Sequence, residues 1–383
     1  MKVIGIIAEY NPFHLGHWKQ LRLVRQVAGE DCGIAVLMSG SFVQRGAPAI
    51  FDKSLRARAA VECGADLVLE LPVNYALASA EGFCSGGVRV LSGFCDGLCF
   101  GTESGDLNTL NAVASALLSG DFSPALHREL ESGMSFPAAR QAALARVGAD
   151  ASLLEKPNDI LAVEYCKAIL AQHSTMQPMP IRREGSYHAD VPDKSNPSAT
   201  ALRGRIESQE PWMDYVPRNA REVFSGAAIH TLAAGERAML GRLRCMEDAE
   251  FAALPYGSEG LWRKFMHQCR AGQTLEEILT QTKSRRYTRS RLDRMAMCAY
   301  LGLTQSAMDT PAPYTRVLAF NGTGREILKM ARRSGRFPHV GEPQLEAFWD
   351  LEQRCTDLYG LFCVDAPEPA GLEAKRRVWM PGK

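Results

Sequence analysis

The chain lacks the features that would place it at once in several broad classes of protein. No stretch of about eighteen apolar residues occurs, so no membrane span is expected, and the apolar run after Met1 is too short for a signal peptide. No two of the eleven cysteines form a CxxC pair, and Cys95 and Cys99 have no histidine at ligand spacing, so no metal ligands are predicted. We therefore expect a cytoplasmic protein with reduced thiols.

An excess of charge is also absent. The sequence holds 44 Lys and Arg against 43 Asp and Glu, a net charge of +1, so any nucleic-acid partner must be bound by a local patch. The hydrophobic content of 46% and the charged content of 23% are typical of globular proteins. A length of 383 residues predicts two or three domains, and no internal repeat is found.

Strand and helix patterns alternate through the first part of the chain. Strands are predicted at 3–8, 33–38, 66–71 and 97–100, and helices at 17–28, 52–63, 78–91 and 107–118. This alternation predicts the α/β class, with a doubly wound parallel sheet and helices on both faces. Ligands of such sheets lie beyond the carboxyl ends of the strands, where the segments 9–17, 39–46 and 101–103 follow.

The later part of the chain is mainly helical. Helices are predicted at 136–147, 157–172, 230–240, 260–270, 275–282, 288–301 and 323–333, with one short strand at 179–183. The segment 208–217 contains two prolines and acidic residues, which is typical of a linker. We therefore divide the chain into an α/β domain, 1–207, and a mainly helical domain, 218–383.

The most informative motif joins the first predicted strand to the first predicted helix. His14-Leu15-Gly16-His17 begins that helix, where backbone N–H groups and the helix dipole favour a phosphate. At a spacing of three residues, His14 and His17 can project to the same side, and both rings can donate hydrogen bonds. Gly16 lets a ligand approach closely. We predict a nucleotide site here, with His14 and His17 as its catalytic residues.

A second phosphate-binding pattern begins another predicted helix. Ser198, Thr200 and Arg203 supply two hydroxyl groups and a guanidinium within one and a half turns, and backbone donors are available at the helix start. The same residues would also suit a capped helix on the surface. Together with the histidine motif, they favour binding of a triphosphate or pyrophosphate.

The segment 283–294 concentrates positive charge. Six cations fall within twelve positions, together with one acidic residue and Tyr287. If the segment is helical, Arg285 and Arg289 share one side, with Arg286 and Arg294 on either flank. A solvated helix face is the ordinary explanation of such a run. Phosphate contacts and a stacking tyrosine would suit RNA, so we predict an RNA-binding set: Lys283, Arg285, Arg286, Tyr287 and Arg289.

These motifs resemble those of the nucleotidyltransferase branch of the HUP-type α/β folds, which carries the HIGH-type signature. Longer strings resemble the bacterial tRNA(Met) cytidine acetate ligase family over nearly the whole chain, from 1 to about 333. They are EYNPFH at 9–14, SGSFVQRG at 39–46, GADLVLELP at 64–72, FGTE at 100–103, KPNDIL at 156–161, RYTR at 286–289 and RVLAFN at 316–321. One departure is Ala199, where the family carries a second hydroxyl.

The resemblance implies an ATP-dependent ligase. Acetate would be activated as acetyl-adenylate with release of pyrophosphate, and the acetyl group would pass to N4 of the wobble cytidine of elongator tRNA(Met), forming N4-acetylcytidine. Domain 1–207 would bind ATP, and domain 218–383 would bind tRNA. Magnesium is expected with ATP, although no pattern specifies its ligands. The implied ATP site comprises Ile7, Ala8, Glu9, Tyr10, Asn11, Pro12, Phe13, His14, Leu15, Gly16, His17, Trp18, Lys19, Gln20, Gly101, Asn158 and Arg183.

Two other functions fit the same residues. A small-molecule adenylyltransferase would use the histidine motif, but it would not need the cations at 283–294. A non-catalytic RNA-binding protein on a nucleotide-binding fold would use those cations, but it would not need the intact histidine pair.

Overall fold

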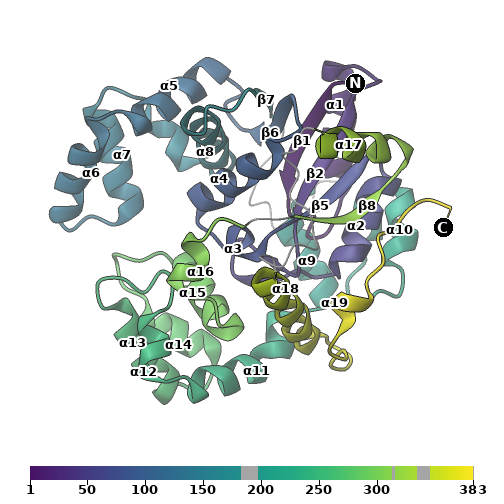
Figure 1. The fold of residues 1–383 in the computed structure, drawn as a ribbon. Helices are drawn as coiled ribbons and strands as arrows, with labels where there is room; N and C mark the ends of the chain where they lie inside the picture. Colours follow the sequence, from purple (N-terminus) through teal and green to yellow (C-terminus); the bar gives the residue numbers. More distant parts are fainter. Residues whose placement is uncertain (183–196, 313–314, 334–345, 383) are drawn as a thin grey trace.

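A computed structural model describes residues 1–182, 197–312, 315–333 and 346–382. At its centre lies a six-stranded sheet in the order β7–β6–β1–β2–β5–β8 (Figure 1). Five neighbouring strands are parallel, and β8 is antiparallel to β5 at the edge. The strands are β1 (Val3–Ala8), β2 (Gly33–Ser39), β5 (Leu67–Leu71), β6 (Gly97–Thr102), β7 (Gln177–Arg182) and β8 (Arg316–Phe320).

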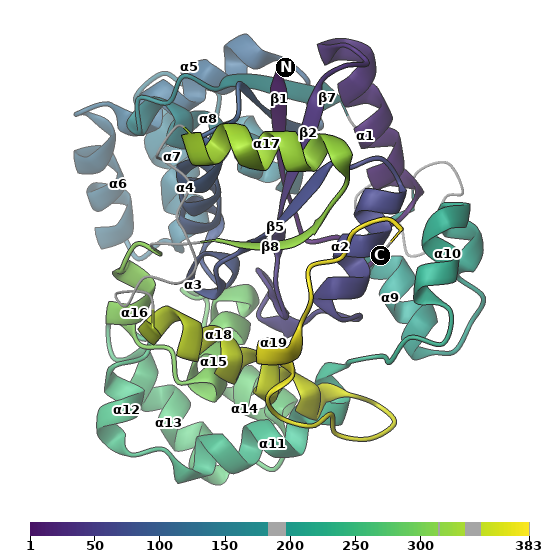
Figure 2. The same ribbon diagram turned by 45° about the vertical axis from the view of Figure 1, so that its right-hand side comes forward.

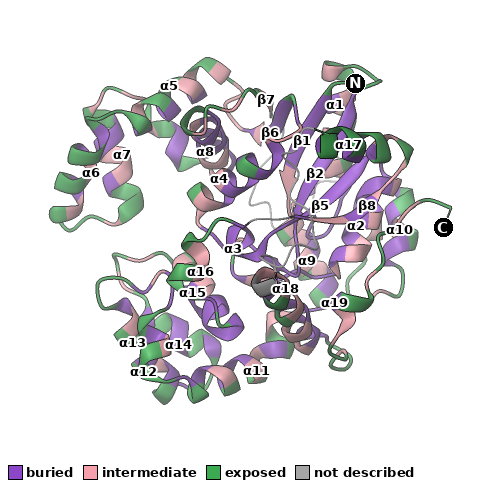
Figure 3. Cartoon of the chain, in the orientation of Figure 1, coloured by how far each residue is buried: buried purple, intermediate pink, exposed green. Residues whose placement is uncertain are grey.

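Both faces of this sheet are buried, as the nearly continuous apolar runs of its strands require. Alternate residues of β2 point into different cores: Ala35 and Leu37 pack on one side, and Ile34 and Val36 pack on the other. Figure 3 shows the central strands as almost wholly buried. The prediction of an α/β protein with a mostly parallel, doubly wound sheet is confirmed.

Helices from distant parts of the chain cover each face. One face carries α4 (Ala80–Leu91), α5 (Leu107–Leu118), α8 (Pro157–Ala171) and α17 (Gly322–Arg333). The other carries α1 (Leu15–Ala28), α2 (Lys53–Glu62), α9 (Ala199–Glu207) and α10 (Arg218–Phe224). Helix α17 crosses the sheet in the turned view of Figure 2. A short arm extends from α5 as α6 (Phe122–Glu131) and α7 (Phe136–Arg146).

A second helical core lies beside the carboxyl ends of the parallel strands (Figure 1). Phe42 and Val43, from the hairpin that follows β2, belong to this core, so the sheet and the helices share apolar packing. The elements of this region are α3 (Val73–Ala76), α11 (Leu232–Cys245), α12 (Asp248–Ala252), α13 (Leu261–Ala271), α14 (Leu275–Thr282), α15 (Arg289–Leu301), α16 (Gln305–Asp309) and α18 (Glu346–Tyr359), with the hairpin strands β3 (Phe42–Val43) and β4 (Ala47–Pro48).

The chain does not stay among the helices after residue 218. Strand β8 pairs with β5, α17 packs on the sheet, and the final segment, with α19 (Leu372–Lys375), runs back beside α2 (Figure 2). Strand β8 was not predicted, because five residues at a sheet edge carry too little periodicity to indicate a strand. The division at 208–217 stays a prediction. No helix over the described residues combines the length and apolar character needed to cross a membrane.

Candidate active site

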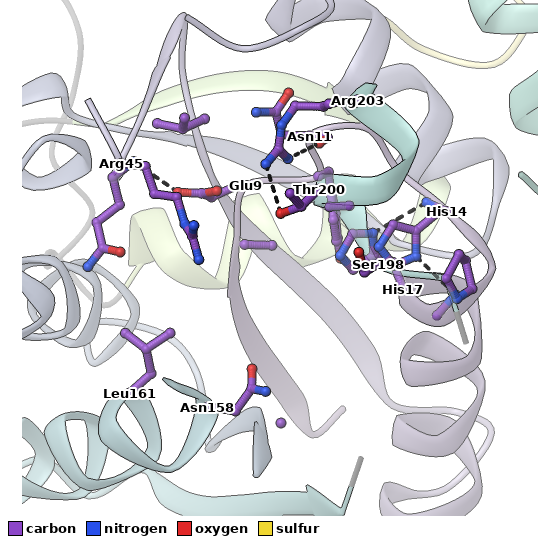
Figure 4. A pocket seen from close by; sticks show the side chains of 18 of the residues that line it. Glu9, Asn11, His14, His17, Arg45, Asn158, Leu161, Ser198, Thr200 and Arg203 are labelled. Carbon is purple, nitrogen blue, oxygen red and sulfur yellow. Dashed lines mark hydrogen bonds between the residues drawn. The ribbon is translucent and has the colours of Figure 1, made fainter. Parts of the chain in front are cut away.

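A cavity of about 370 Å³ opens beyond the carboxyl ends of β1 and β6, where parallel α/β sheets bind their ligands. Several separate parts of the chain line it, from the β1–α1 loop to the start of α11. Its charged lining residues include the cations Lys19, Arg45, Arg182 and Arg203, together with the carboxylates Glu9, Glu103 and Glu207. Figure 4 shows His14 and His17 on one wall and Arg45 on the opposite side.

The two histidines of the motif cap helix α1 reciprocally. His14 is the N-cap residue, and its Nδ1 accepts a hydrogen bond from the backbone N–H of Gly16 at 3.1 Å. In return, Nδ1 of His17 accepts from the backbone N–H of His14 at 3.3 Å. The two rings stack with their centroids 3.7 Å apart. The predicted projection of both rings to one side is therefore present.

This capping fixes the tautomer of both rings. A ring nitrogen that accepts a hydrogen bond carries no proton, so each neutral imidazole carries its proton on Nε2. The expectation that open backbone amides would bind the phosphate is wrong at these positions. The N–H of Gly16 donates to His14 Nδ1, and those of His17 and Trp18 donate to the carbonyl of His14. Each neutral ring can therefore donate a hydrogen bond only through its Nε2.

Aromatic rings support the histidine pair from behind. The ring of Tyr10 contacts those of Phe13 and His17 with both centroid separations at 4.8 Å, and Tyr10 and Phe13 are buried. Burial raises the pKa of Tyr10 far above its usual value, so the phenol stays protonated. These contacts restrict the rotation of His17 and keep it aligned with His14.

The second predicted phosphate element lies against the histidine loop. Ser198 caps α9 by accepting from the N–H of Ala201. The guanidinium of Arg203 donates to the carbonyl of Asn11 at 2.8 Å and to Thr200 Oγ1 at 3.1 Å (Figure 4). Two motifs almost two hundred residues apart in sequence thus meet at one wall of the cavity.

The loop after β6 is locked onto the start of α8. The carboxylate of Glu103 accepts from the side chain of Asn158 at 2.6 Å and from the N–H of Asp159 at 2.8 Å. The carboxylate of Asp159 in turn accepts from the N–H groups of Glu103 and Ser104 and from the hydroxyl of Thr102. This exchange satisfies the first turn of α8, which has no side-chain cap of its own, and fixes Gly101 and Asn158 at the cavity.

A buried arginine that sequence reasoning missed joins two loops at the cavity. Arg56 is fully buried and donates to the carbonyls of Glu9, Ser39 and Phe51 at 2.7 to 3.0 Å, and to that of Gly40. Its position in α2, between Leu55 and Ala57, gave no signal of this role. Glu9 also accepts from the N–H of Gln44 at 2.9 Å, which orients the hairpin that carries Arg45.

Most of the predicted ATP residues line the cavity, but not all. Those that do are Ile7, Ala8, Glu9, Tyr10, Asn11, His14, Gly16, His17, Lys19, Gln20, Gly101, Asn158, Ser198, Thr200 and Arg203. Pro12, Phe13, Leu15 and Trp18 are not among the described lining residues, and Phe13 is fully buried behind the histidines. Arg183 lies outside the described residues, although its neighbour Arg182 lines the cavity.

The sequence also missed lining residues that come from the helical region. His230, Thr231 and Leu232, at the start of α11, close one side of the cavity. Burial lowers the pKa of His230, an effect that Glu368 opposes. No spacing in the sequence links residue 230 to the histidine motif, because the contact depends on tertiary packing alone.

The basic segment differs from its prediction. Helix α15 begins at Arg289, after the N-cap Thr288, so Arg285 does not share a helix face with Arg289. Arg289 forms a bidentate pair with Glu276, at 2.7 and 2.6 Å, and this contact lowers the pKa of Glu276 to about 2. Arg286 and Tyr287 both bind Glu259. Acidic residues distant in sequence thus neutralise part of the run.

The segment is nevertheless connected to the cavity. A Cβ added at Gly46, in the hairpin tip beside Arg45, would lie 2.5 Å from the backbone of Asp293, so the hairpin packs directly on the start of α15. Gly46 has φ +76°, which also favours glycine at this position. The hairpin therefore joins the cavity wall to the basic segment.

Comparisons with known proteins agree on one family. Residues 1–371 match the family model described as HIGH Nucleotidyl Transferase. The chain is 33% identical to the tRNA(Met) cytidine acetate ligase of Acetivibrio thermocellus, with 99% of each chain covered, and 34% identical to that of Caldicellulosiruptor saccharolyticus, with 100% of each covered.

Solved structures point the same way. Thermotoga maritima TmcAL without ligand superposes with a TM-score of 0.91 at 30% identity, and its form bound to alpha-thio ATP superposes with a TM-score of 0.88 at 30% identity; each comparison covers 99% of both chains. The chain belongs to the tRNA(Met) cytidine acetate ligase family.

Proposed function

We infer that the chain is an ATP-dependent ligase that activates acetate as acetyl-adenylate and transfers the acetyl group to N4 of the wobble cytidine of elongator tRNA(Met). The observation that carries this proposal is the stacked imidazole pair at the start of α1, with Arg203 and Thr200 on the same wall of the cavity. A relative with the same fold binds alpha-thio ATP. Because tRNA is the acceptor, we place this activity in the cytoplasm.

In the first step, acetate attacks the α-phosphorus of ATP. A new O–P bond forms, the bond to the bridging oxygen breaks, and pyrophosphate leaves. Negative charge builds up on the phosphate oxygens, and His14 and His17, which both line the cavity, can donate to these oxygens from Nε2. One preorganised donor of this kind is typically worth about 3 kcal/mol of barrier. Magnesium enters as part of the MgATP substrate, held mainly by the phosphates.

Acetate needs a positive partner opposite the histidines. Arg45 lines the cavity from the hairpin on the other side, and a guanidinium matches a carboxylate in geometry and charge. We therefore assign Arg45 to hold the acetate carboxylate against the α-phosphate. Holding acetate and ATP in line in one cavity supplies a large rate advantage. The protein needs no nucleophile of its own, because acetate is the nucleophile.

In the second step, the cytidine N4 amine attacks the acetyl carbonyl of the mixed anhydride, and AMP leaves. The anhydride is already activated, so this step depends mainly on bringing the base to the cavity, which requires it to leave its stack. The hairpin with Arg45 and Gly46 joins the cavity to the basic segment 283–294. Lys283 and Arg285 are exposed there, and within the described part of the chain their side chains make no hydrogen bond or ion pair, which suits contact with the tRNA backbone.

The direct test is to incubate the protein with elongator tRNA(Met), ATP and isotopically labelled acetate, and to analyse the tRNA nucleosides by mass spectrometry. We expect labelled N4-acetylcytidine only when ATP is present, with AMP and pyrophosphate as the other products. Formation of a dinucleotide from ATP, with the tRNA unmodified, would instead indicate a small-molecule adenylyltransferase. Unmodified tRNA without ATP consumption would leave only an RNA-binding role.

A further inference from the structure

Three metal-ligating side chains converge behind the wall of the cavity formed by the start of α11. His230, Cys363 and Glu368 offer ligand atoms that all lie within 4.8 Å of one another. The sequence predicts no metal ligands, and the three residues share no motif spacing, because two come from the segment after α18 and one precedes α11.

The backbone fixes two of these side chains next to each other. The N–H of Thr231 donates to the carbonyl of Phe362 at 3.0 Å, and the N–H of Val364 donates to that of Ile229 at 2.8 Å. Between these bonds, His230 and Cys363 form an antiparallel bridge. Residues opposite each other in such a non-hydrogen-bonded pair have Cα atoms about 4.5 Å apart and side chains on the same face. The antiparallel bridge therefore places the imidazole of His230 next to the thiol of Cys363.

A separate turn brings the third side chain to the other two. The N–H of Glu368 donates to the carbonyl of Gly360 at 3.0 Å and closes the loop from 360 to 368 over the bridge. A Cβ at Gly360 would lie 3.0 Å from that of Glu368, so the absence of a side chain at 360 allows this close approach. The carboxylate Oε2 then lies 3.3 Å from Nε2 of His230.

Among the described residues, the buried imidazole of His230 has a charged neighbour, the carboxylate of Glu368, but no hydrogen bond of good geometry. Its side chain is 0% exposed, and neither ring nitrogen makes a hydrogen bond within the described structure. Its ring stacks on Tyr359 with a centroid separation of 4.1 Å, which holds its orientation. A buried polar group without a hydrogen bond is costly, and it indicates a missing partner at that place.

We propose that His230, Cys363 and Glu368 bind a zinc ion that clamps the C-terminal segment to the start of α11. A nitrogen, a thiolate sulfur and a carboxylate oxygen form a ligand set that suits zinc, and tetrahedral bonds of about 2.0–2.3 Å place ligand atoms about 3–4 Å apart. Glu368 is 25% exposed and can move the short distance required, so that water can supply the fourth ligand. The ion supplies the partner that His230 lacks and fixes the wall formed by His230, Thr231 and Leu232.

The test uses the full chain, stripped with a chelator and then dialysed against zinc. We expect about one zinc ion per chain by elemental mass spectrometry, and a higher Tm with zinc than without it. Cobalt used in place of zinc should give the near-ultraviolet charge-transfer absorption of a cobalt–thiolate bond.

Variants separate this site from adventitious binding. Cys363→Ser and Glu368→Gln should each lose the bound zinc and the zinc-dependent rise in Tm. Glu368→Gln serves if Cys363→Ser does not fold. Cys245→Ser, which removes an exposed thiol elsewhere, should keep both. Wild-type protein without stoichiometric zinc, or equal zinc in Cys363→Ser and Cys245→Ser, would overturn the proposal and leave an ordinary His–Glu pair. No readout requires ligase activity, so the outcome is independent of the proposed function.

Discussion

The histidine loop and the basic segment are both conspicuous in the sequence, yet the fold treats them differently. At the histidine loop, residues of the β1–α1 segment and of α9 line one cavity and are hydrogen-bonded to one another. In the basic segment, Arg286 and Arg289 are paired with Glu259 and Glu276, and Lys283 and Arg285 project beside them. The first region forms one wall of a cavity, and the second is a partly neutralised surface.

The difference follows from how far apart the interacting residues lie. His14 and His17 are one helical turn apart, so their stacking and mutual capping depend on local geometry that the sequence contains. The state of Arg289 depends on Glu276, which lies on a different helix. Short-range chemistry can therefore be predicted from spacing, whereas the net charge of a surface depends on tertiary contacts.

The largest expected effect comes from removing the imidazole donors while keeping the helix cap. Asn at position 14 retains an N-cap acceptor, and Gln at position 17 retains the capping-box acceptor, but neither places a donor where Nε2–H lies. We expect His14→Asn and His17→Gln each to lower acetate-dependent ATP–pyrophosphate exchange by about 10²- to 10³-fold, with a Tm close to wild type. The exposed residue His127 offers a control, and His127→Asn should keep full exchange.

Wild-type rates of exchange in both His14→Asn and His17→Gln would show that the two imidazoles do not take part in the reaction. The start of α1 would then be a structural cap, and the first half of the comparison would fail.

A smaller loss is expected at the second element of the cavity. Arg203→Met removes two charged hydrogen bonds, to Asn11 and Thr200, and weakens the phosphate wall. A hydrogen bond to a charged group is worth about 1.5–3 kcal/mol. The kcat/KM for ATP in the exchange reaction should therefore fall by about 10- to 100-fold. Arg205→Met, in the same helix but paired outside the cavity with Glu210, should change little. Equal losses in the two variants would show that α9 contributes only stability.

At the basic segment, the two cations without described partners should matter more than the paired one. The double variant Lys283→Ala, Arg285→Ala should bind tRNA more weakly in filter-binding titrations at several salt concentrations. The slope of log affinity against log salt concentration should fall in magnitude by about two, because each lost phosphate contact reduces that slope by about one. Arg289→Ala should lower it less, because Glu276 already neutralises this guanidinium. ATP–pyrophosphate exchange should be unchanged in both variants. A greater loss in Arg289→Ala than in the double variant would reverse the assignment.

The smallest expected effect is an increase in tRNA affinity. Glu276→Gln should release Arg289 for tRNA, and because Glu276 is 68% exposed, the pair is worth at most about 1 kcal/mol. We expect tRNA affinity to rise by about two- to fivefold, measured by the same titration at fixed salt. A fall in affinity would mean that the pair positions the segment rather than masking it.

The sequence alone predicted the sheet, the histidine pair and the Ser198 element, because each depends on periodicity or on neighbours within a turn. It missed β8, which completes the sheet from the far end of the chain, and Arg56, whose partners come from two loops. It also missed His230 at the cavity wall and the pairing of Arg289. All four depend on contacts between residues far apart in sequence, which spacing does not encode.

The central claim is that the triphosphate of ATP lies against Nε2 of His14 and His17 at the start of α1. A crystal structure of this chain with a non-hydrolysable ATP analogue tests it most directly. We predict phosphate oxygens at about 2.7–3.2 Å from both Nε2 atoms, with Arg203 beside them. An analogue bound elsewhere, or in this cavity with its phosphates turned away from both rings, would contradict the account.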